Sequence, residues 1–131
     1  MAGYSGTPLP KKLGVDGERS VHLIGAPPGF EKLIAAGGDK RIRRNGKSPA
    51  DVVMLFVKSA ADLKRGLPVA KKLLGDGGGI WIAWPKKTSG LQTDLGEAIV
   101  RQSGLDTGLV DYKICAIDAT WSGLKFARRK R

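Results

Sequence analysis

Continuous apolar runs alternate along the chain with segments of helical periodicity. Residues 52–57 and 80–84 are apolar throughout, which is typical of parallel strands covered on both faces. A further strand is predicted over residues 20–26, and a closing hairpin over residues 110–118 and 124–129, with its last strand at the edge. Strands that alternate with helices indicate parallel βαβ units. We therefore expect an α/β fold: a small Rossmann-like three-layer domain with a mostly parallel sheet and a C-terminal antiparallel hairpin.

Capping residues and helix breakers predict where the first helices begin and end. A short helix is expected over residues 30–36, closed by two glycines. Ser59, followed three residues later by Asp62, has the spacing of a capping box and begins the next helix. Gly66 and Pro68 are expected to break that helix into two short ones.

The remaining segments are predicted in the same way. Gly75 and the glycines at positions 77–79 are expected to end the second short helix before a strand begins. Asp94 is expected to cap the last helix, with Glu97 in the matching position and Gly104 at its end. The basic stretch around residues 41–44 favours at most one short edge strand.

Length and composition are typical of a globular protein with its own core. The chain has 131 residues, of which 41% are hydrophobic, so we expect one α/β domain over residues 1–131. Residues 1–19 form a turn-rich N-terminal arm in this prediction, and residues 128–131 form a basic tail. No apolar run approaches the roughly 20 residues that a membrane helix needs, and the first residues lack a secretory signal. These features predict a cytoplasmic protein with no membrane partner.

Catalytic and metal-binding signals are weak. Cys115 is the single cysteine and His22 the single histidine, which excludes a cysteine zinc cluster and favours a reducing compartment. Both residues lie within predicted strands, where a packed core thiol and a hydrogen-bonded imidazole are expected. No hydrolase, zinc-peptidase or P-loop motif is present. We therefore predict no catalytic residue and no metal.

The chain carries a strong positive charge. It has 23 Lys and Arg against 12 Asp and Glu, for a net charge of +11. Such a charge attracts nucleic acid, anionic membranes or phosphorylated metabolites without choosing among them. Two basic clusters form a predicted nucleic-acid patch: Lys40, Arg41, Arg43, Arg44, Lys47, Arg128, Arg129, Lys130 and Arg131. No helix-turn-helix, RNA-binding aromatic strand or zinc finger accompanies them, so a solubilising basic tail is the competing interpretation.

Four loops are predicted to meet at the carboxyl edge of the sheet, where ligands bind in open α/β folds. They span residues 25–29, 58–59, 86–90 and 118–123. The loop at 86–90 offers two lysines and two hydroxyls before a helix start, which favours a phosphate or carboxylate. The predicted ligand-binding residues are Lys86, Lys87, Thr88, Ser89, Gly90, Ser59, Trp121 and Ser122. In the competing interpretation the two lysines are solvated and Trp121 packs the hairpin onto the sheet.

Three stretches carry a resemblance to a known family. They are AGYSGTPLPKKLG at residues 2–14, WPKKTSG at 84–90 and DATWSGLKF at 118–126. Together they resemble a family of small bacterial proteins known as a domain of unknown function, and the similarity covers nearly the whole chain. The resemblance implies a bacterial cytosolic protein. It implies no particular activity, so no functional residues carry over from it.

The architecture is also similar to the second half of Rossmann-type methyltransferases, which place a glycine-rich turn before an apolar strand and close with a hairpin. The chain departs from that pattern in two respects. Two prolines stand in the sequence GAPPG at residues 25–29, where they remove backbone donors and stiffen the loop. No acidic residue follows a second strand to hold a ribose hydroxyl. The sequence therefore predicts no S-adenosylmethionine or NAD cofactor.

Three hypotheses of function result. The main prediction is a non-enzymatic Rossmann-like module that binds a small anionic ligand, or an acidic partner, at the carboxyl edge. The first alternative is a basic nucleic-acid-associated protein. The second alternative is a divergent transferase-like enzyme.

Overall fold

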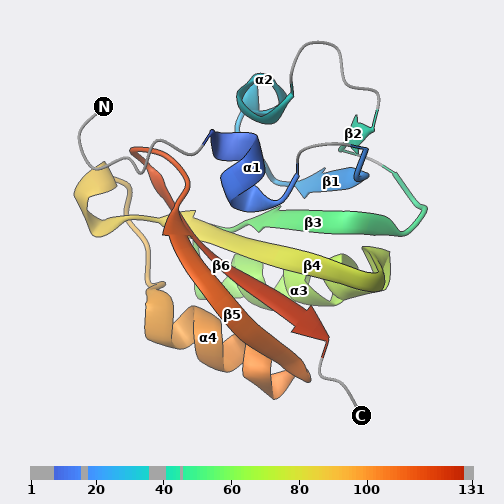
Figure 1. Cartoon of the computed structure of the whole chain (residues 1–131). Coiled ribbons are helices and arrows are strands. Elements are labelled where there is room, and N and C mark those ends of the chain that lie inside the picture. The colour runs from blue at the N-terminus through green and yellow to red at the C-terminus, as the bar shows by residue number, and fades with distance from the viewer. Residues whose placement is uncertain (1–7, 16–17, 36–40, 45, 129–131) are drawn as a thin grey trace.

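The computed structural model describes residues 8–15, 18–35, 41–44 and 46–128 of the chain. Six strands form one sheet in the order β2-β1-β3-β4-β6-β5. Their bounds are β1 (Val21–Ile24), β2 (Ile42–Arg43), β3 (Ala50–Phe56), β4 (Leu74–Pro85), β5 (Leu109–Ala116) and β6 (Trp121–Arg128). The strands β1 to β4 pair in parallel, and β6 runs antiparallel between β4 and β5 (Figure 1). The predicted α/β class, with its mostly parallel sheet and antiparallel hairpin, is confirmed.

Helices cover both faces of this sheet, which gives the predicted three layers (Figure 1). They are α1 (Leu9–Leu13) and α2 (Phe30–Ile34) on one face, α3 (Ala60–Leu73) and α4 (Glu97–Asp106) on the other, and a 3-10 turn η1 (Lys87–Ser89) in a loop. None of the helices in the described segments is long and apolar enough to cross a membrane.

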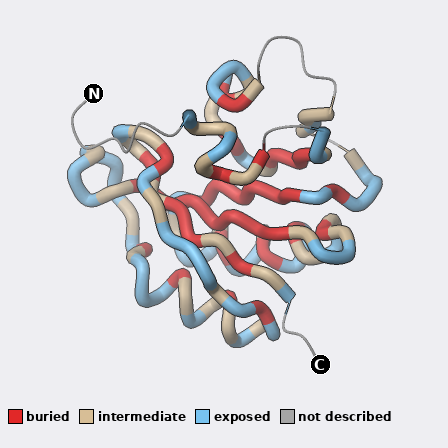
Figure 2. Tube along the Cα trace, in the orientation of Figure 1, coloured by how far each residue is buried: buried red, intermediate tan, exposed pale blue. Residues whose placement is uncertain are grey.

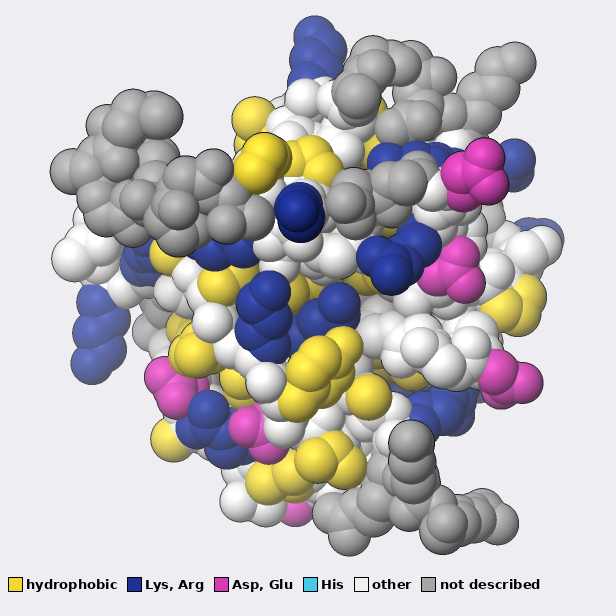
Figure 3. All heavy atoms as spheres, in the orientation of Figure 1, with side chains coloured by type: hydrophobic (Ala, Val, Ile, Leu, Met, Phe, Trp, Pro, Cys, Tyr) yellow, Lys and Arg dark blue, Asp and Glu magenta, His cyan; other side chains and the backbone are white. Residues whose placement is uncertain are grey.

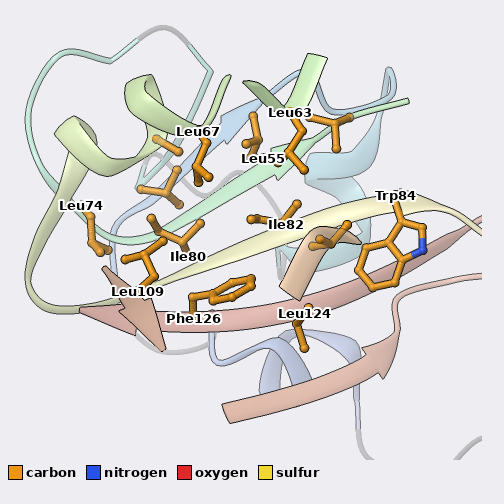
Figure 4. Close-up of a cluster of buried hydrophobic side chains, with 14 of the residues drawn as sticks. Leu55, Leu63, Leu67, Leu74, Ile80, Ile82, Trp84, Leu109, Leu124 and Phe126 are labelled. Atoms are coloured by element: carbon orange, nitrogen blue, oxygen red, sulfur yellow. The ribbon is translucent and has the colours of Figure 1, made fainter. Parts of the chain in front are cut away.

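Strand β3 shows why the central strands are apolar throughout. Val53 and Leu55 belong to the hydrophobic cluster under α3 and α4, which Figure 4 shows in close-up. Val52, Met54 and Phe56 belong to the cluster under α1 and α2. Because successive side chains of a strand point to opposite faces, a strand covered by helices on both sides needs apolar residues at every position.

The antiparallel strand is not at the edge of the sheet, so that part of the hairpin prediction is wrong. Strand β6 pairs with β4 on one side and with β5 on the other, which makes β5 the edge strand. Trp121, Leu124 and Phe126 of β6 are buried, whereas Val110 and Tyr112 of β5 are exposed (Figure 2). The more apolar strand of the hairpin therefore occupies the inner position, where it is paired with a strand on each side.

The predicted break at Gly66 and Pro68 is also wrong, because α3 continues through both residues. The start of the helix is as predicted: Ser59 is its N-cap, and the Asp62 amide donates to Ser59 Oγ at 3.1 Å. At Gly66 the helix lies against the sheet so closely that a Cβ would be 2.7 Å from Leu55 Cδ1. Gly66 therefore serves close packing rather than helix termination. The burial of the apolar face of α3 offsets the cost of its internal proline.

The last helix begins later and ends later than predicted. It starts at Glu97 with Gly96 as N-cap, and Asp94 instead accepts a hydrogen bond from the Ala60 amide at 2.8 Å. Gly104 lies inside α4, where a Cβ would be 2.2 Å from Cε2 of Phe126. The glycine therefore admits the Phe126 ring instead of ending the helix. Similarly, the glycines predicted to end the second short helix belong to β4, which begins at Leu74.

Candidate functional site

The chain changes direction across the sheet at β1, because β2 lies on one side of this strand and β3 on the other. In open α/β sheets such a switch point forms a crevice beyond the carboxyl ends of the strands, where ligands bind. A cavity of about 370 Å³ lies at this place. Its apolar wall consists of Ile24, Leu55, Phe56, Val57 and Trp121. The volume lies within the range of about 300–1,000 Å³ that is common for small-molecule sites.

The loop after β1 gives a ligand access to the backbone. Gly25 has φ +70°, and a Cβ at this position would be 2.8 Å from the carbonyl oxygen of Phe56, so that residue is confined to glycine. Gly29 has φ +80°, and no atom lies within 4 Å of the place that a Cβ would occupy, which leaves open space beside it. The absence of side chains at both ends of the loop permits close approach of a ligand, as in nucleotide-binding turns.

Three charged residues line the cavity: Lys58, which lies just before α3, and Asp62 and Arg65, which lie in the first two turns of α3. The Asp62 carboxylate accepts a hydrogen bond from the Lys58 amide at 3.2 Å and pairs with Arg65 Nη2 at 2.6 Å. The side chain of Arg65 is 73% exposed, so its guanidinium keeps donors free for a ligand. Sequence reasoning missed Arg65, although the predicted helix start at Ser59 places it within two turns of the carboxyl edge.

Arg44 follows β2, at the place where dinucleotide-binding folds have an acidic residue that binds a ribose hydroxyl. Its guanidinium donates to the carbonyl oxygens of Ala26 and Pro27, both at 2.7 Å, and forms a bidentate pair with Glu31 at 2.5 and 2.9 Å. The hydrogen bond from Arg44 lowers the pKa of Glu31 to about 2. Arg44 therefore holds the loop at residues 25–29 onto α2 with four of its five N–H donors, and its role as a nucleic-acid contact stays a prediction.

The Glu31–Arg44 pair predicts a loss of stability in acid. The folded-state pKa of Glu31 lies below its ordinary value of 4.5, so the contribution of the pair is present above pH 4.5 and is lost as pH falls toward about 2. Because the Glu31 side chain is 37% exposed, we expect a contribution of only about 0.2–1 kcal/mol. Thermal unfolding followed across this pH range should show that decrease in the parent chain and not in Glu31→Gln. An equal acid dependence in both proteins would contradict the assignment.

The four predicted loops do meet at the carboxyl edge, but they form two hollows rather than one. The Lys86 amide donates to the Thr120 carbonyl oxygen at 2.8 Å, which joins the loops at 86–90 and 118–123. Lys87 and Ser59 line a second hollow of about 570 Å³ together with Asp94. Lys58 lines both hollows.

The remaining members of the predicted anion site are separated or already hydrogen-bonded. Trp121 lines the switch-point cavity, where its ring packs edge-on against Phe56 at a centroid distance of 5.1 Å. Ser89 Oγ donates to the Lys86 carbonyl oxygen at 2.6 Å, and Ser122 pairs with Trp84 inside the sheet. Thr88 and Gly90 are part of the same loop and do not line either hollow.

The described residues of the two basic clusters lie on different parts of the sheet. Three strands, β1, β3 and β4, separate β2 from β6. Arg41 donates to the carbonyl oxygens of Val15 and Arg19, and Arg128 donates to those of Lys71 and Leu74. Two further described members, Arg43 and Lys47, line a separate hollow beside β1 and β2. Lys40, Arg129, Lys130 and Arg131 lie outside the described residues.

The cysteine and the histidine have structural surroundings. His22 is 4% exposed, and its Nε2 lies 3.0 Å from the Arg44 carbonyl oxygen, so the predicted hydrogen-bonded imidazole is confirmed. Cys115 is partly buried on the edge strand and packs against the cluster under α1 and α2, so the predicted packing of this thiol is confirmed, although it is not fully buried. Burial raises the pKa of its thiol, against the opposing effect of Lys12, Lys113 and Lys125.

Comparisons with solved structures show which proteins share this fold. A ribosomal protein L11 methylase from Lactobacillus delbrueckii matches with a TM-score of 0.61 and 12% identity, over 93% of this chain and 76% of the other. Fibrillarin from Aeropyrum pernix, in complex with natively bound S-adenosylmethionine, matches with a TM-score of 0.60 and 14% identity, over 95% and 70%. A tRNA methyltransferase of B. subtilis matches with a TM-score of 0.55 and 12% identity, over 92% and 64%. No family model and no curated protein matches the chain.

These comparisons contradict the main prediction of a non-enzymatic module that binds a small anion. Six of the matched structures are methyltransferases or complexes with S-adenosylmethionine or its demethylated product. The resemblance to a family of small bacterial proteins is not addressed by them and stays a prediction.

Proposed function

We propose that the protein is a divergent methyltransferase-like enzyme that binds S-adenosylmethionine in the switch-point cavity. The observation that carries the proposal is the position of this cavity, at the carboxyl ends of β1 and β3 beside the left-handed Gly25. The fold shared with methyltransferases supports it. When bound, this donor supplies a methyl group on a cationic sulfur.

The residues of the cavity fit parts of such a donor. The wall formed by Leu55, Phe56 and Trp121 is apolar and largely aromatic, and it suits a flat nucleobase. At the mouth, the exposed guanidinium of Arg65 suits the donor's carboxylate, and the Asp62 carboxylate suits its ammonium group. The roles of these residues are to bind and orient the donor and to exclude water from one side of it.

One part of the usual donor site is absent from the described residues. No carboxylate directly follows β2, where the chain has Arg44. Two prolines also leave the loop at 25–29 with fewer amide donors. We therefore expect weaker binding of the ribose than in enzymes that supply an acidic residue there.

Calorimetric titration with S-adenosylmethionine and S-adenosylhomocysteine tests the proposal. We expect saturable binding of both compounds, and roughly tenfold weaker binding to Arg65→Gln because a charge-assisted hydrogen bond is lost. Lys64→Gln is the matched control, since Lys64 is an exposed neighbour on α3 that does not line the cavity. The absence of heat and of any thermal stabilisation with both compounds would refute donor binding. Equal weakening by the two variants would refute the role of Arg65.

The single cysteine of the chain supports a cytoplasmic location for this enzyme, because reducing compartments do not select for disulfides. Fractionation of the native host, with the protein detected by antibody, tests this part of the proposal. Recovery in an extracytoplasmic fraction would contradict it.

A further inference from the structure

No helix of the described residues covers one face of the β5–β6 hairpin (Figures 1 and 2). Tyr112, on the edge strand β5, is 58% exposed, and Val110 on the same strand is 37% exposed. Asp111 turns to the opposite face, where its carboxylate pairs with Arg101 of α4 at 2.8 Å. The uncovered face therefore presents the Tyr112 ring, whereas the neighbouring carboxylate of Asp111 lies on the other face.

Three lysines from three elements surround the end of α1 on this face. Lys113 Nζ of β5 donates to the Lys12 carbonyl oxygen at 2.7 Å, and Lys125 Nζ of β6 lies 3.4 Å from that of Leu13. Lys12 Nζ of α1 donates in turn to the Ala116 carbonyl oxygen at 3.1 Å. Each of these contacts uses one of the three donors of an ammonium group, so donors remain for a ligand on all three lysines.

Carboxylates of the described residues do not neutralise the charges of these lysines. No ion pair involves Lys12, Lys113 or Lys125 within the segments that the structure describes. Burial lowers the pKa of Lys125, and the positive charges of Lys113 and Arg19 lower it further. Figure 3 shows Lys and Arg side chains gathered over α1 and the hairpin, next to exposed hydrophobic side chains. The face therefore attracts anions.

The exposed ring lies within the same cluster. Lys125 Nζ is 5.8 Å from the centroid of the Tyr112 ring, so a cation and an aromatic surface lie side by side. Proteins that bind single-stranded nucleic acid combine these two features: cations follow the phosphates, and aromatic rings stack with unpaired bases. An acidic peptide would use the lysines but would gain nothing from the ring. A duplex keeps its bases stacked on one another and cannot use the ring either.

We propose that the face defined by Lys12, Tyr112, Lys113 and Lys125 binds single-stranded nucleic acid, with phosphates on the lysines and a base stacked on Tyr112. Strand β5 leads from Tyr112 toward the carboxyl edge of the sheet, about 13 Å away over four residues. Trp121, in the wall of the switch-point cavity, begins the next strand there. A bound strand would thus extend toward the donor site. The identification of nucleic acid as the substrate rests on the proposed function, whereas the binding itself does not.

Fluorescence anisotropy with labelled single-stranded DNA and RNA oligonucleotides, in the absence of any methyl donor, tests the proposal. We expect affinity that falls as salt rises, and a slope in the log–log plot that decreases by about 0.7 for Lys113→Gln. Tyr112→Leu should weaken binding at least about fivefold with the slope unchanged, because stacking is lost and charge is kept. Tyr112→Phe should retain the parental affinity.

Three comparisons make the result decisive. Lys64→Gln, on the opposite face of the sheet, changes the net charge as Lys113→Gln does and should leave the affinity nearly unchanged. Polyglutamate and duplex DNA should bind more weakly than the single strand and should not respond to Tyr112→Leu. Equal effects of the two lysine variants, or parental affinity of Tyr112→Leu for the single strand, would overturn the proposal. Because no donor is present, these outcomes are separate from a failure of the donor site.

Discussion

Gly25→Ala should abolish donor binding and lower the free energy of unfolding by about 2–5 kcal/mol. A side chain at φ +70° costs about 1–2 kcal/mol. The new Cβ would also lie 2.8 Å from the Phe56 carbonyl oxygen, and such overpacking costs typically about 1–3 kcal/mol more. Because that oxygen belongs to the end of β3, relief of the clash separates β1 from β3 and distorts the wall of the switch-point cavity.

Gly29→Ala is the matched control for this prediction. Gly29 has a similar φ of +80°, but no atom lies within 4 Å of a Cβ there, so its replacement should cost only the backbone strain of about 1–2 kcal/mol. Urea denaturation gives the two free energies, and calorimetry at a temperature where both variants are folded gives donor binding. Equal destabilisation by the two substitutions would show that the close contact between Gly25 and β3 does not add to the cost of Gly25→Ala. Parental donor binding by a folded Gly25→Ala would show that the donor binds elsewhere.

The central strands can be predicted from the sequence because their signal is local. An apolar residue at every position of β3 requires helices on both faces of the sheet, and the structure has them. The order of the hairpin strands cannot be predicted in this way. It depends on the pairing of β6 with both β4 and β5, and long-range pairing leaves no periodic pattern in either strand.

The predicted helix ends are wrong where glycine serves tertiary packing. Within a sequence pattern, glycine usually indicates the end of a helix. The sequence therefore favours a helix end at both Gly66 and Gly104. In the structure each glycine lies within a helix, because a bulky side chain, Leu55 or Phe126, occupies the space of its missing Cβ. Only the partner across the interface distinguishes these two uses of glycine.

The candidate site can be predicted in position but not in composition. The carboxyl edge follows from strand order alone, and the loops at 25–29, 58–59, 86–90 and 118–123 do meet there. The division into two hollows depends on where each side chain lies, and Trp121 lines the same hollow as Phe56, whereas Lys87 lines the other. Likewise, Arg44 belongs to a basic cluster in the sequence, yet its guanidinium is used by Glu31 and two carbonyl oxygens.

Phe126→Ala should lower the free energy of unfolding by about 3–5 kcal/mol, the usual cost of removing a buried phenylalanine ring. Phe126 is fully buried in the cluster under α3 and α4 (Figure 4), and its ring occupies the space beside Gly104. Chemical denaturation measures the change. A cost near about 1 kcal/mol, well below the usual range, would mean that the ring does not fix the position of α4 on the sheet.

The contact between Phe126 and Gly104 also determines whether Gly104→Ala stabilises or destabilises the protein, which gives a sharper test. In the parent chain Gly104→Ala should destabilise by about 1–3 kcal/mol, because the new methyl group clashes with the ring. In a Phe126→Ala background the ring is gone, and the higher helix propensity of alanine should then make Gly104→Ala stabilising by up to about 1 kcal/mol. A double-mutant cycle with this change of sign would establish that Gly104 is needed because the Phe126 ring occupies the space of a Cβ. Additive free energies would instead show that Gly104 and Phe126 act independently.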